Sequence, residues 1–161
     1  MFLIVLLVSL TFASFFGHAI HWLIHQRWTG PVYRAHMDHH LKQYPPSDLL
    51  SKTYRHAKWY NSGPLLFTPP LVMIMLAAMA VLWFFGMPLW ALTTFAVTMI
   101  CFGFVNDYVH DNSHIEGHWL ERFAWFRNLR ATHFQHHHNM KRNFGIVLFV
   151  WDKLFKTYIK R

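Results

Sequence analysis

Two long stretches of this chain carry no charged side chain, and they restrict the fold more than any other feature of the sequence. No Lys, Arg, Asp or Glu occurs from Met1 to Gln26 or from Tyr60 to Val105. A helix of roughly 20 apolar residues crosses the ~30 Å hydrocarbon core of a bilayer, so the first stretch is long enough for one crossing. The second stretch is interrupted at Gly86-Met87-Pro88, a sequence typical of a turn. It therefore predicts a hairpin of two further transmembrane helices.

The predicted fold is an all-α, integral-membrane helical bundle of about three transmembrane helices, at residues 2–25, 64–85 and 89–109. In this interpretation residues 1–161 form a single membrane-embedded domain. Hydrophobic residues make up 54% of the chain and charged residues 14%, which excludes a disordered chain and leaves too little polar surface for a soluble domain. A cleaved signal peptide is the alternative for the first span, but signal peptides begin with basic residues.

The charged residues, 15 basic and seven acidic, all lie between Arg27 and Lys58 or between Asp107 and Arg161. Three crossings put these segments on one side of the membrane, and the positive-inside rule places that side in the cytoplasm. The histidine-bearing segments 27–60 and 110–161 are thus expected to form a cytoplasmic, histidine-rich helical cap. Contact with anionic lipids explains the net charge of +8. No nucleic-acid partner is expected, because the sequence has no recognition motif for DNA or RNA.

Histidine is the second unusual feature, because the chain has 14 histidines against seven acidic residues. Ten of them fall into four clusters with helical spacing, in the order HxxxH, HxxHH, HxxxH and HxxHH. The clusters are His21 and His25; His36, His39 and His40; His110 and His114; and His133, His136 and His137. Residues three or four positions apart share one face of a helix, so each cluster is expected to project from one side.

Neutral imidazole is a common ligand of Fe, Zn, Cu and Ni, so the ten clustered histidines are predicted metal ligands. The alternative is a set of interfacial or core histidines that hydrogen bonds satisfy. Ten ligands are too many for one ion, which indicates two metal ions. The single Cys101 excludes an iron–sulfur site, and nitrogen ligands leave Fe, Zn, Mn or Cu as candidates. Iron suits a lipid-facing site best. A hydrocarbon C–H bond has no polar group on which acid–base chemistry could act, so its attack requires activated oxygen, which two iron ions can generate.

The four clusters, followed by NFGIVLFVWDKLFKTY at residues 143–158, resemble the fatty acid hydroxylase and sterol desaturase superfamily of integral-membrane di-iron enzymes. The similarity extends from Gly17 to Tyr158, with Lys156 where the superfamily usually has glycine. It implies a di-iron centre on a transmembrane bundle, with two Fe ions as cofactor. Zinc is the alternative metal in purified protein. Some features are similar to bacterial carotenoid hydroxylases and others to the sterol and fatty acyl branch, so the branch stays open.

The resemblance also implies a reaction and its partners. The expected protein is a membrane di-iron oxygenase that hydroxylates or desaturates a lipid (fatty acyl, sterol or carotenoid) with O2 and with electrons from a ferredoxin or a b-type cytochrome. Superfamily members often have four spans, so a partner subunit, such as a second copy in a homo-oligomer, could close the substrate cavity. Two alternatives belong to other classes: a metal-dependent membrane lipid hydrolase, and a metal transporter or sensor. Transport is disfavoured because Tyr60 to Val105 contains no histidine, acid or base.

Seven further residues are candidates for an additional ligand or for a contact that orients the ligands, because they adjoin the clusters or match the terminal segment. They are His18, His118, Asp38, Asp107, Asp111, Asn143 and Asp152. A carboxylate can accept the second ring N–H of a ligating histidine and fix its orientation. The alternative for the aspartates that adjoin the clusters is a solvated carboxylate. His138 and His56 are expected to bind no metal.

Overall fold

The computed structural model describes residues 1–55 and 66–159, and within these ranges every regular element is a helix. The α-helices are α1 (Phe2–Ile24), α2 (Pro31–Asp38), α3 (Thr68–Phe84), α4 (Leu89–Asn112), α5 (Ala124–His138) and α6 (Val150–Leu154). Three short elements are the 3-10 turns η1 (Arg27–Thr29) and η3 (Trp119–Arg122) and the π-helical turn η2 (His39–Gln43). The prediction of an all-α fold is confirmed over the described residues.

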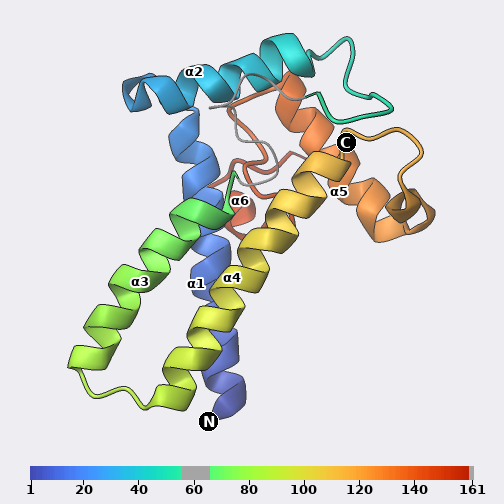
Figure 1. Ribbon diagram of the computed structural model, residues 1–161. Coiled ribbons are helices and arrows are strands. Elements are labelled where there is room, and N and C mark those ends of the chain that lie inside the picture. Colours follow the sequence, from blue (N-terminus) through green and yellow to red (C-terminus); the bar gives the residue numbers. More distant parts are fainter. Residues whose placement is uncertain (56–65, 160–161) are drawn as a thin grey trace.

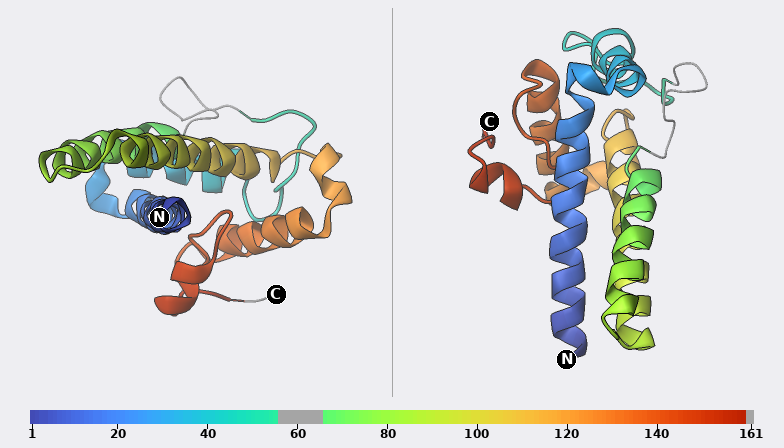
Figure 2. Two further views of the ribbon diagram at one scale, coloured as in Figure 1. Left: turned by 90° about the horizontal axis from the view of Figure 1, so that it is seen from below. Right: turned by 90° about the vertical axis from the view of Figure 1, so that its left-hand side faces the viewer.

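Helices α1, α3 and α4 form the elongated part of the molecule (Figure 1). Helices α3 and α4 are antiparallel neighbours joined by a short turn, in which Gly86 has a φ of +78° that residues with a side chain rarely adopt. Pro88 follows as the N-cap residue of α4. Helix α1 packs along α4, and the hairpin turn lies at the same end of the molecule as the N-terminus (Figures 1 and 2). The hairpin thus turns where the sequence predicts it.

Small residues let these helices approach closely. A Cβ atom at Gly103 of α4 would lie 3.0 Å from the Cα of Thr68, and one at Gly17 of α1 would lie 3.2 Å from the ring of Phe102. Apolar side chains such as Met99 fill the space between the helices, and many of their outward faces are apolar as well. Close contacts at small residues together with apolar outer faces are typical of helices that pack inside a membrane.

Helices α1 and α4, with 23 and 24 residues, are long and apolar enough to span a bilayer. They correspond to the expected spans at residues 2–25 and 89–109. Helix α3 is also apolar but has 17 residues, and at about 1.5 Å per residue it extends about 26 Å, slightly less than the hydrocarbon core. The expected span 64–85 is therefore a shorter helix in the structure, and residues 64 and 65 lie outside the described residues. The third crossing stays a prediction.

Asp107, near the end of α4, fastens the start of α3. Its carboxylate accepts hydrogen bonds from the backbone N–H groups of Phe67 (2.7 Å) and Thr68 (2.9 Å) and from the Thr68 hydroxyl. The first N–H groups of a helix have no partner within it, so a buried carboxylate at this position stabilises the helix start. Asp107, a sequence candidate for a contact with the histidines, thus joins α3 to α4.

Most of the remaining elements form a cap at the opposite end of the bundle from the N-terminus, and α6 lies beside the middle of α1 (Figures 1 and 2). Gly30, with a φ of +63°, and Pro31 turn the chain from η1 into α2, which lies across the end of α1. Helix α6 packs against α1, where the indole N–H of Trp151 donates to the hydroxyl of Ser14 (3.0 Å). The cap therefore covers the helix ends that carry the first and third histidine clusters.

Candidate metal centre

All ten clustered histidines meet where the ends of α1 and α4 adjoin η2 and α5. Nine of them form two groups, and within each group one ring nitrogen of every residue lies within 4.8 Å of the others. The first histidine group consists of His21, His25, His36, His40 and His136. The second histidine group consists of His39, His110, His114 and His133.

His137, the tenth clustered histidine, adjoins both groups. Its Nε2 lies 3.2 Å from the Nε2 of His133 in the second group, and its ring centroid lies 4.1 Å from that of His40 in the first. The side chain is fully buried. The structure therefore brings together every histidine that the spacing singles out, and their role as ligands stays a prediction.

The sequence motifs divide between the groups in a regular way. The HxxxH pair at the end of α1 enters the first group, and the corresponding pair at the end of α4 enters the second. The HxxHH motif that runs from α2 into η2 is shared, because His36 and His40 belong to the first group while His39 belongs to the second. The motif of α5 is shared too, with His136 in the first group and His133 in the second. Each HxxHH motif thus joins the two groups, which helical spacing alone does not predict.

Backbone carbonyl groups orient four of the rings from the outer side of the site. The Nδ1 atoms of His21, His114, His136 and His137 lie 2.6–2.9 Å from the carbonyl oxygens of Phe144, Leu49, Arg142 and Tyr44, respectively. A carbonyl oxygen only accepts hydrogen bonds, so each Nδ1 carries the proton and each Nε2 keeps a lone pair. These four imidazoles therefore present Nε2 as the available ligand atom.

A carboxylate orients a fifth ring. The Nδ1 of His110 lies 3.0 Å from Oδ1 of Asp111, the next residue of α4. The hydroxyl of Tyr54 hydrogen-bonds to the same aspartate. Asp111 therefore has the geometry to fix the tautomer of His110 and to leave its Nε2 for a metal ion.

Hydrogen bonding alone does not satisfy the inner nitrogen atoms. The Nε2 atoms of His114 and His137 lie 3.0 Å and 3.2 Å from the Nε2 of His133, and both keep a lone pair. His133 can donate a proton to only one of them. Among the described residues, three further Nε2 atoms are buried without a hydrogen-bond partner, those of His21, His39 and His110. Lone pairs that converge in this way repel one another unless cations lie among them, so the residues fit a pair of metal ions.

Burial keeps the histidines outside the spans neutral. Desolvation lowers the pKa of His136 to about 4. Burial and nearby histidines also lower the pKa values of His36, His39, His40, His114, His133 and His137 well below 6.5. Neutral imidazole is the form that binds metal ions, so these rings are already in the ligand form at neutral pH.

The terminal segment holds the carbonyl group that orients His21. Asp152 accepts hydrogen bonds from the backbone N–H groups of Phe144 (2.8 Å) and Gly145 (2.7 Å) and from the hydroxyl of Thr157 (2.7 Å). A Cβ atom at Gly145 would lie 2.8 Å from Oδ2 of Asp152, so only glycine allows this approach. Asp152 therefore fixes the backbone at Phe144, whose carbonyl accepts the His21 Nδ1–H.

His18 lies on the other side of Asp152. Its Nδ1 is 3.5 Å from Oδ2 of Asp152, and its ring packs against Phe144. Burial opposes the ionisation of Asp152, but the neighbouring His18 ring and the hydrogen bonds from Thr157 and Gly145 outweigh burial and lower the pKa of this carboxyl group. His18 belongs to neither histidine group, and the structure makes it a partner of the carboxylate.

Asn143 anchors the start of the same segment. The residue is fully buried and has a φ of +54°, a left-handed conformation that asparagine tolerates better than most residues. Its side chain accepts from the N–H of Ile159 (2.9 Å) and donates to the carbonyl groups of Ile159 (3.1 Å) and Thr132 (3.4 Å). Asn143 therefore ties both ends of the terminal segment to α5.

The other candidates lie apart from the two groups. Asp38 forms an ion pair with Lys42 (2.7 Å), and His118 accepts a backbone hydrogen bond at the start of η3. Of the two histidines expected to bind no metal, His138 is exposed at the end of α5 and His56 lies outside the described residues.

In the segment after η2, the sequence did not point to three residues that support the site, namely Tyr44, Leu49 and Tyr54. Two of them act through backbone carbonyl groups, which every residue has and which therefore leave no signal in the sequence. All three lie in the irregular segment that follows η2. Tyr44 is fully buried, and its hydroxyl accepts the backbone N–H of Arg55 (2.6 Å), which holds this segment against the site.

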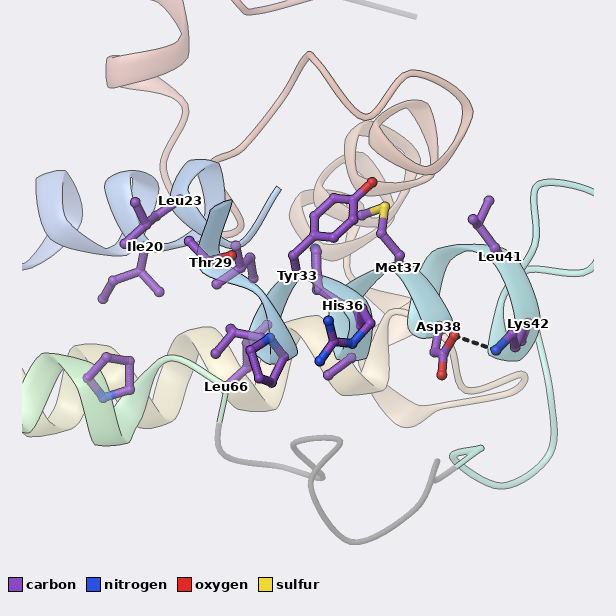
Figure 3. Close-up of a pocket in the computed structure, with 16 residues that line it drawn as sticks. Ile20, Leu23, Thr29, Tyr33, His36, Met37, Asp38, Leu41, Lys42 and Leu66 are labelled. Carbon is purple, nitrogen blue, oxygen red and sulfur yellow. Dashed lines mark ion pairs between the residues drawn. The ribbon is translucent and has the colours of Figure 1, made fainter. Parts of the chain in front are cut away.

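A groove opens beside the first histidine group (Figure 3). It has a volume of about 1050 Å³ and runs between the end of α1, helix α2 and the start of α3. Its lining is mostly apolar, with Ile20, Leu23 and Leu66 on its walls, and His36 of the first group reaches it. Lys42 contributes a polar group at the η2 side. The groove has the size and apolar character of a site for a hydrocarbon chain, and it leads to a candidate metal ligand.

Comparison with known proteins agrees with this geometry. The family model of fatty acid hydroxylases matches residues 6–157. The chain is similar to the ceramide very long chain fatty acid hydroxylase of Saccharomyces cerevisiae, with 33% identity over 97 residues that make up 59% of this chain and 24% of the yeast protein. The chain thus matches about a quarter of that relative's length. No solved structure matches the chain. Because the matched residues include all four histidine clusters, helix α4 and most of helix α1, this chain is a membrane protein that belongs to the fatty acid hydroxylase family.

Proposed function

We propose that this protein hydroxylates the hydrocarbon chain of a membrane lipid with O2 and two external electrons. The observation that carries the proposal is the convergence of ten histidines beside a groove with a mostly apolar lining. In balanced form, R–H, O2, two electrons and two protons give R–OH and H2O. Family membership supports hydroxylation, and the name of the yeast relative supports a fatty acyl lipid as the substrate.

The two histidine groups would hold one iron ion each, with His137 completing the second group. Iron bound there supplies the activation of O2 that attack on a C–H bond requires. The protein's own residues prepare the site for this chemistry. The contacts at Nδ1 aim the imidazoles inward, burial keeps them neutral and excludes water, and the groove brings an alkyl chain to His36.

We also propose a topology in which α3 is a third crossing and the cap faces the cytoplasm. The support is the antiparallel pairing of α3 with α4, and the position of the cap at the end that carries the charged segments. A ferredoxin or a b-type cytochrome would then deliver electrons from the cytoplasm. A second copy of the chain in a homo-oligomer would cover the open side of the groove.

Oxygen labelling tests the reaction. The purified protein is supplied with iron, membrane lipids, an electron donor and ¹⁸O2 gas, and the lipids are analysed by mass spectrometry. We expect one ¹⁸O atom in a new hydroxyl group. A new double bond without label would indicate a desaturase instead. Label that enters only from H2¹⁸O, in protein that contains zinc and works without O2, would indicate a lipid hydrolase, the function favoured if the imidazoles bind zinc.

A further inference from the structure

A small chamber lies at the meeting point of the two histidine groups. It has a volume of about 10 Å³ and is lined by His36 of the first group and by His39 and His110 of the second. A space of this size holds roughly one water-sized molecule. Ala35 and Leu66 line both this chamber and the groove, so the chamber adjoins the groove that we assign to the lipid chain.

Gln43 brings an unused hydrogen-bond donor to this chamber. It is the last residue of η2, seven positions after His36 and four after His39, so it continues the face of the chain that carries these histidines. Its amide Nε2 is buried and has no hydrogen-bond partner within the part of the chain that the structure describes. Tyr54, which also lines the chamber, has a partner in Asp111. Buried amide groups without a partner are rare in proteins because they are costly, which points to a ligand that accepts this hydrogen bond.

We propose that the side-chain amide of Gln43 donates a hydrogen bond to a water-sized acceptor, an oxygen or halide ligand, held in the chamber between the two histidine groups. The inference rests on the proposed function, since metal ions bound by the histidines would hold the same ligand from the opposite side. Of the other described residues that line the chamber and carry polar side chains, His36, His39 and His110 are predicted metal ligands and Tyr54 has a partner in Asp111.

Fluoride is a suitable probe because it is a single-atom hydrogen-bond acceptor. The purified protein is loaded with Co²⁺, whose visible absorption reports changes in its ligands, and sodium fluoride is titrated. The variants are Gln43→Leu, which removes the amide, and Gln43→Glu, which keeps the size of the side chain but loses the N–H donors. Gln26→Leu is the matched control, because the amide of Gln26 donates to the carbonyl of Trp22 outside the chamber.

Both Gln43 variants are expected to keep the cobalt content of the parent and to bind fluoride about tenfold more weakly, the loss typical of one hydrogen bond to a charged acceptor. Gln26→Leu should match the parent. Fluoride affinity that stays within twofold of the parent in both Gln43 variants overturns the inference. Loss of cobalt from both also overturns it, because Gln43 would then support the fold instead. A parent protein that binds no metal defeats the proposed function itself, so the two failures are distinguishable.

Discussion

His137 and His138 are consecutive residues of α5 in opposite environments. His137 is fully buried beside both histidine groups, whereas His138 is exposed. We expect His137→Ala to lower the metal content from about two ions per chain to about one or fewer, because it removes a neutral Nε2 from the site. His138→Ala should leave the metal content unchanged. Elemental analysis of gently purified protein measures both, and equal losses in the two variants would contradict the assignment.

The pKa values of the buried histidines predict how the metal-free protein responds to acid. In the unfolded chain these histidines titrate near 6.5, but in the folded protein their pKa values are much lower, about 4 for His136. Below pH 6.5 the unfolded chain therefore binds more protons than the folded one, and the free energy of unfolding falls by about 1.4 kcal/mol per pH unit for each such histidine. Stability should be full above pH 6.5 and decrease below it.

Thermal unfolding of the metal-free protein in detergent, followed by circular dichroism at pH 7.5, 6.5 and 5.5, tests this dependence. We expect the midpoint to fall between the last two pH values more than between the first two. A midpoint that is constant or rises on acidification would show that the rings are not buried as neutral groups.

The histidines were predictable from the sequence, and most of the groups that orient them were not. Four clusters with helical spacing identify the ten rings that meet in the structure, because helix geometry fixes where each cluster projects. The carbonyl groups of Tyr44 and Leu49 come from an irregular segment, whose path depends on tertiary contacts. Asp107 lies three residues before His110 and Asp111 directly follows it, and both were candidates for a contact with the histidines, yet Asp107 binds the start of α3. The sequence did not reveal this role of Asp107.

At the scale of elements, the backbone conformation after α6 explains why glycine is expected at position 156, where this chain has lysine. Lys156 occupies a position where the resemblance leads one to expect glycine, and its φ of +58° is a left-handed conformation. Such a conformation costs a residue with a side chain about 1 kcal/mol relative to glycine. We expect Lys156→Gly to stabilise the protein by up to about that amount.

Lys153→Gly is the matched control for this substitution, because Lys153 lies inside α6 and is exposed. Glycine within a helix should destabilise the protein by about 1 kcal/mol. Thermal unfolding in detergent compares the variants with the parent. A lower midpoint for Lys156→Gly would contradict the argument from backbone conformation.

Asp152 links α6 to the metal centre through the backbone at Phe144. Asp152→Asn replaces one carboxylate oxygen by an N–H donor, which cannot accept the hydrogen bonds from Phe144 and Gly145 together. The carbonyl that orients His21 should then shift, and we expect the affinity for metal to fall about tenfold or more, as is typical when an outer partner of a ligand is lost.

Asp38→Asn is the control for this variant, because Asp38 pairs with Lys42 at the surface of the cap. It should retain the metal affinity of the parent. Competition with a chelator of known affinity measures both variants. Equal affinities in Asp152→Asn and Asp38→Asn would mean that the terminal segment does not act on the site.

The helices were predictable where a long charge-free run marks them in the sequence. Their bounds were less predictable where tertiary contacts set them. Charge-free runs gave α1, α3, α4 and the turn at Gly86, because only apolar helices suit a membrane interior. The length of α3 was overestimated, since its start is set by the hydrogen bonds of Asp107 to Phe67 and Thr68. The π-helical turn η2 also has no sequence signature, although it carries His39 and His40 to different histidine groups.

At the scale of the whole molecule, the bundle and the cap each contribute two of the four histidine motifs. The bundle contributes two HxxxH pairs at the ends of its long helices, and the cap contributes two HxxHH motifs, each shared between the histidine groups. Neither part holds a complete group alone, so the site forms only when the cap docks on the helix ends. Metal ions that bind this assembled site should stabilise the docked cap, because a ligand that binds only the folded state shifts the equilibrium toward it.

The position of the hairpin turn tests the orientation of the molecule in the membrane. The turn and the N-terminus lie at one end, and the cap with its basic residues lies at the other, so three crossings place the turn outside the cell. In a Cys101→Ser background, Phe85→Cys puts a thiol at the exposed turn and Lys141→Cys puts one on the cap surface. We expect a membrane-impermeant maleimide to label the Phe85→Cys thiol in intact cells and the Lys141→Cys thiol only after permeabilisation.

Other labelling patterns would contradict either the cytoplasmic position of the cap or the crossing of α3. Labelling of both thiols in intact cells, or of the Lys141→Cys thiol alone, would overturn the cytoplasmic cap. The result also bears on α3, whose 17 residues are near the lower limit for a crossing. If α3 and α4 formed a re-entrant hairpin, the turn would stay within the bilayer and the Phe85→Cys thiol would react from neither side. Access from outside would therefore establish that α3 crosses the membrane, since α3 and α4 together must carry the chain from the cap to the turn and back.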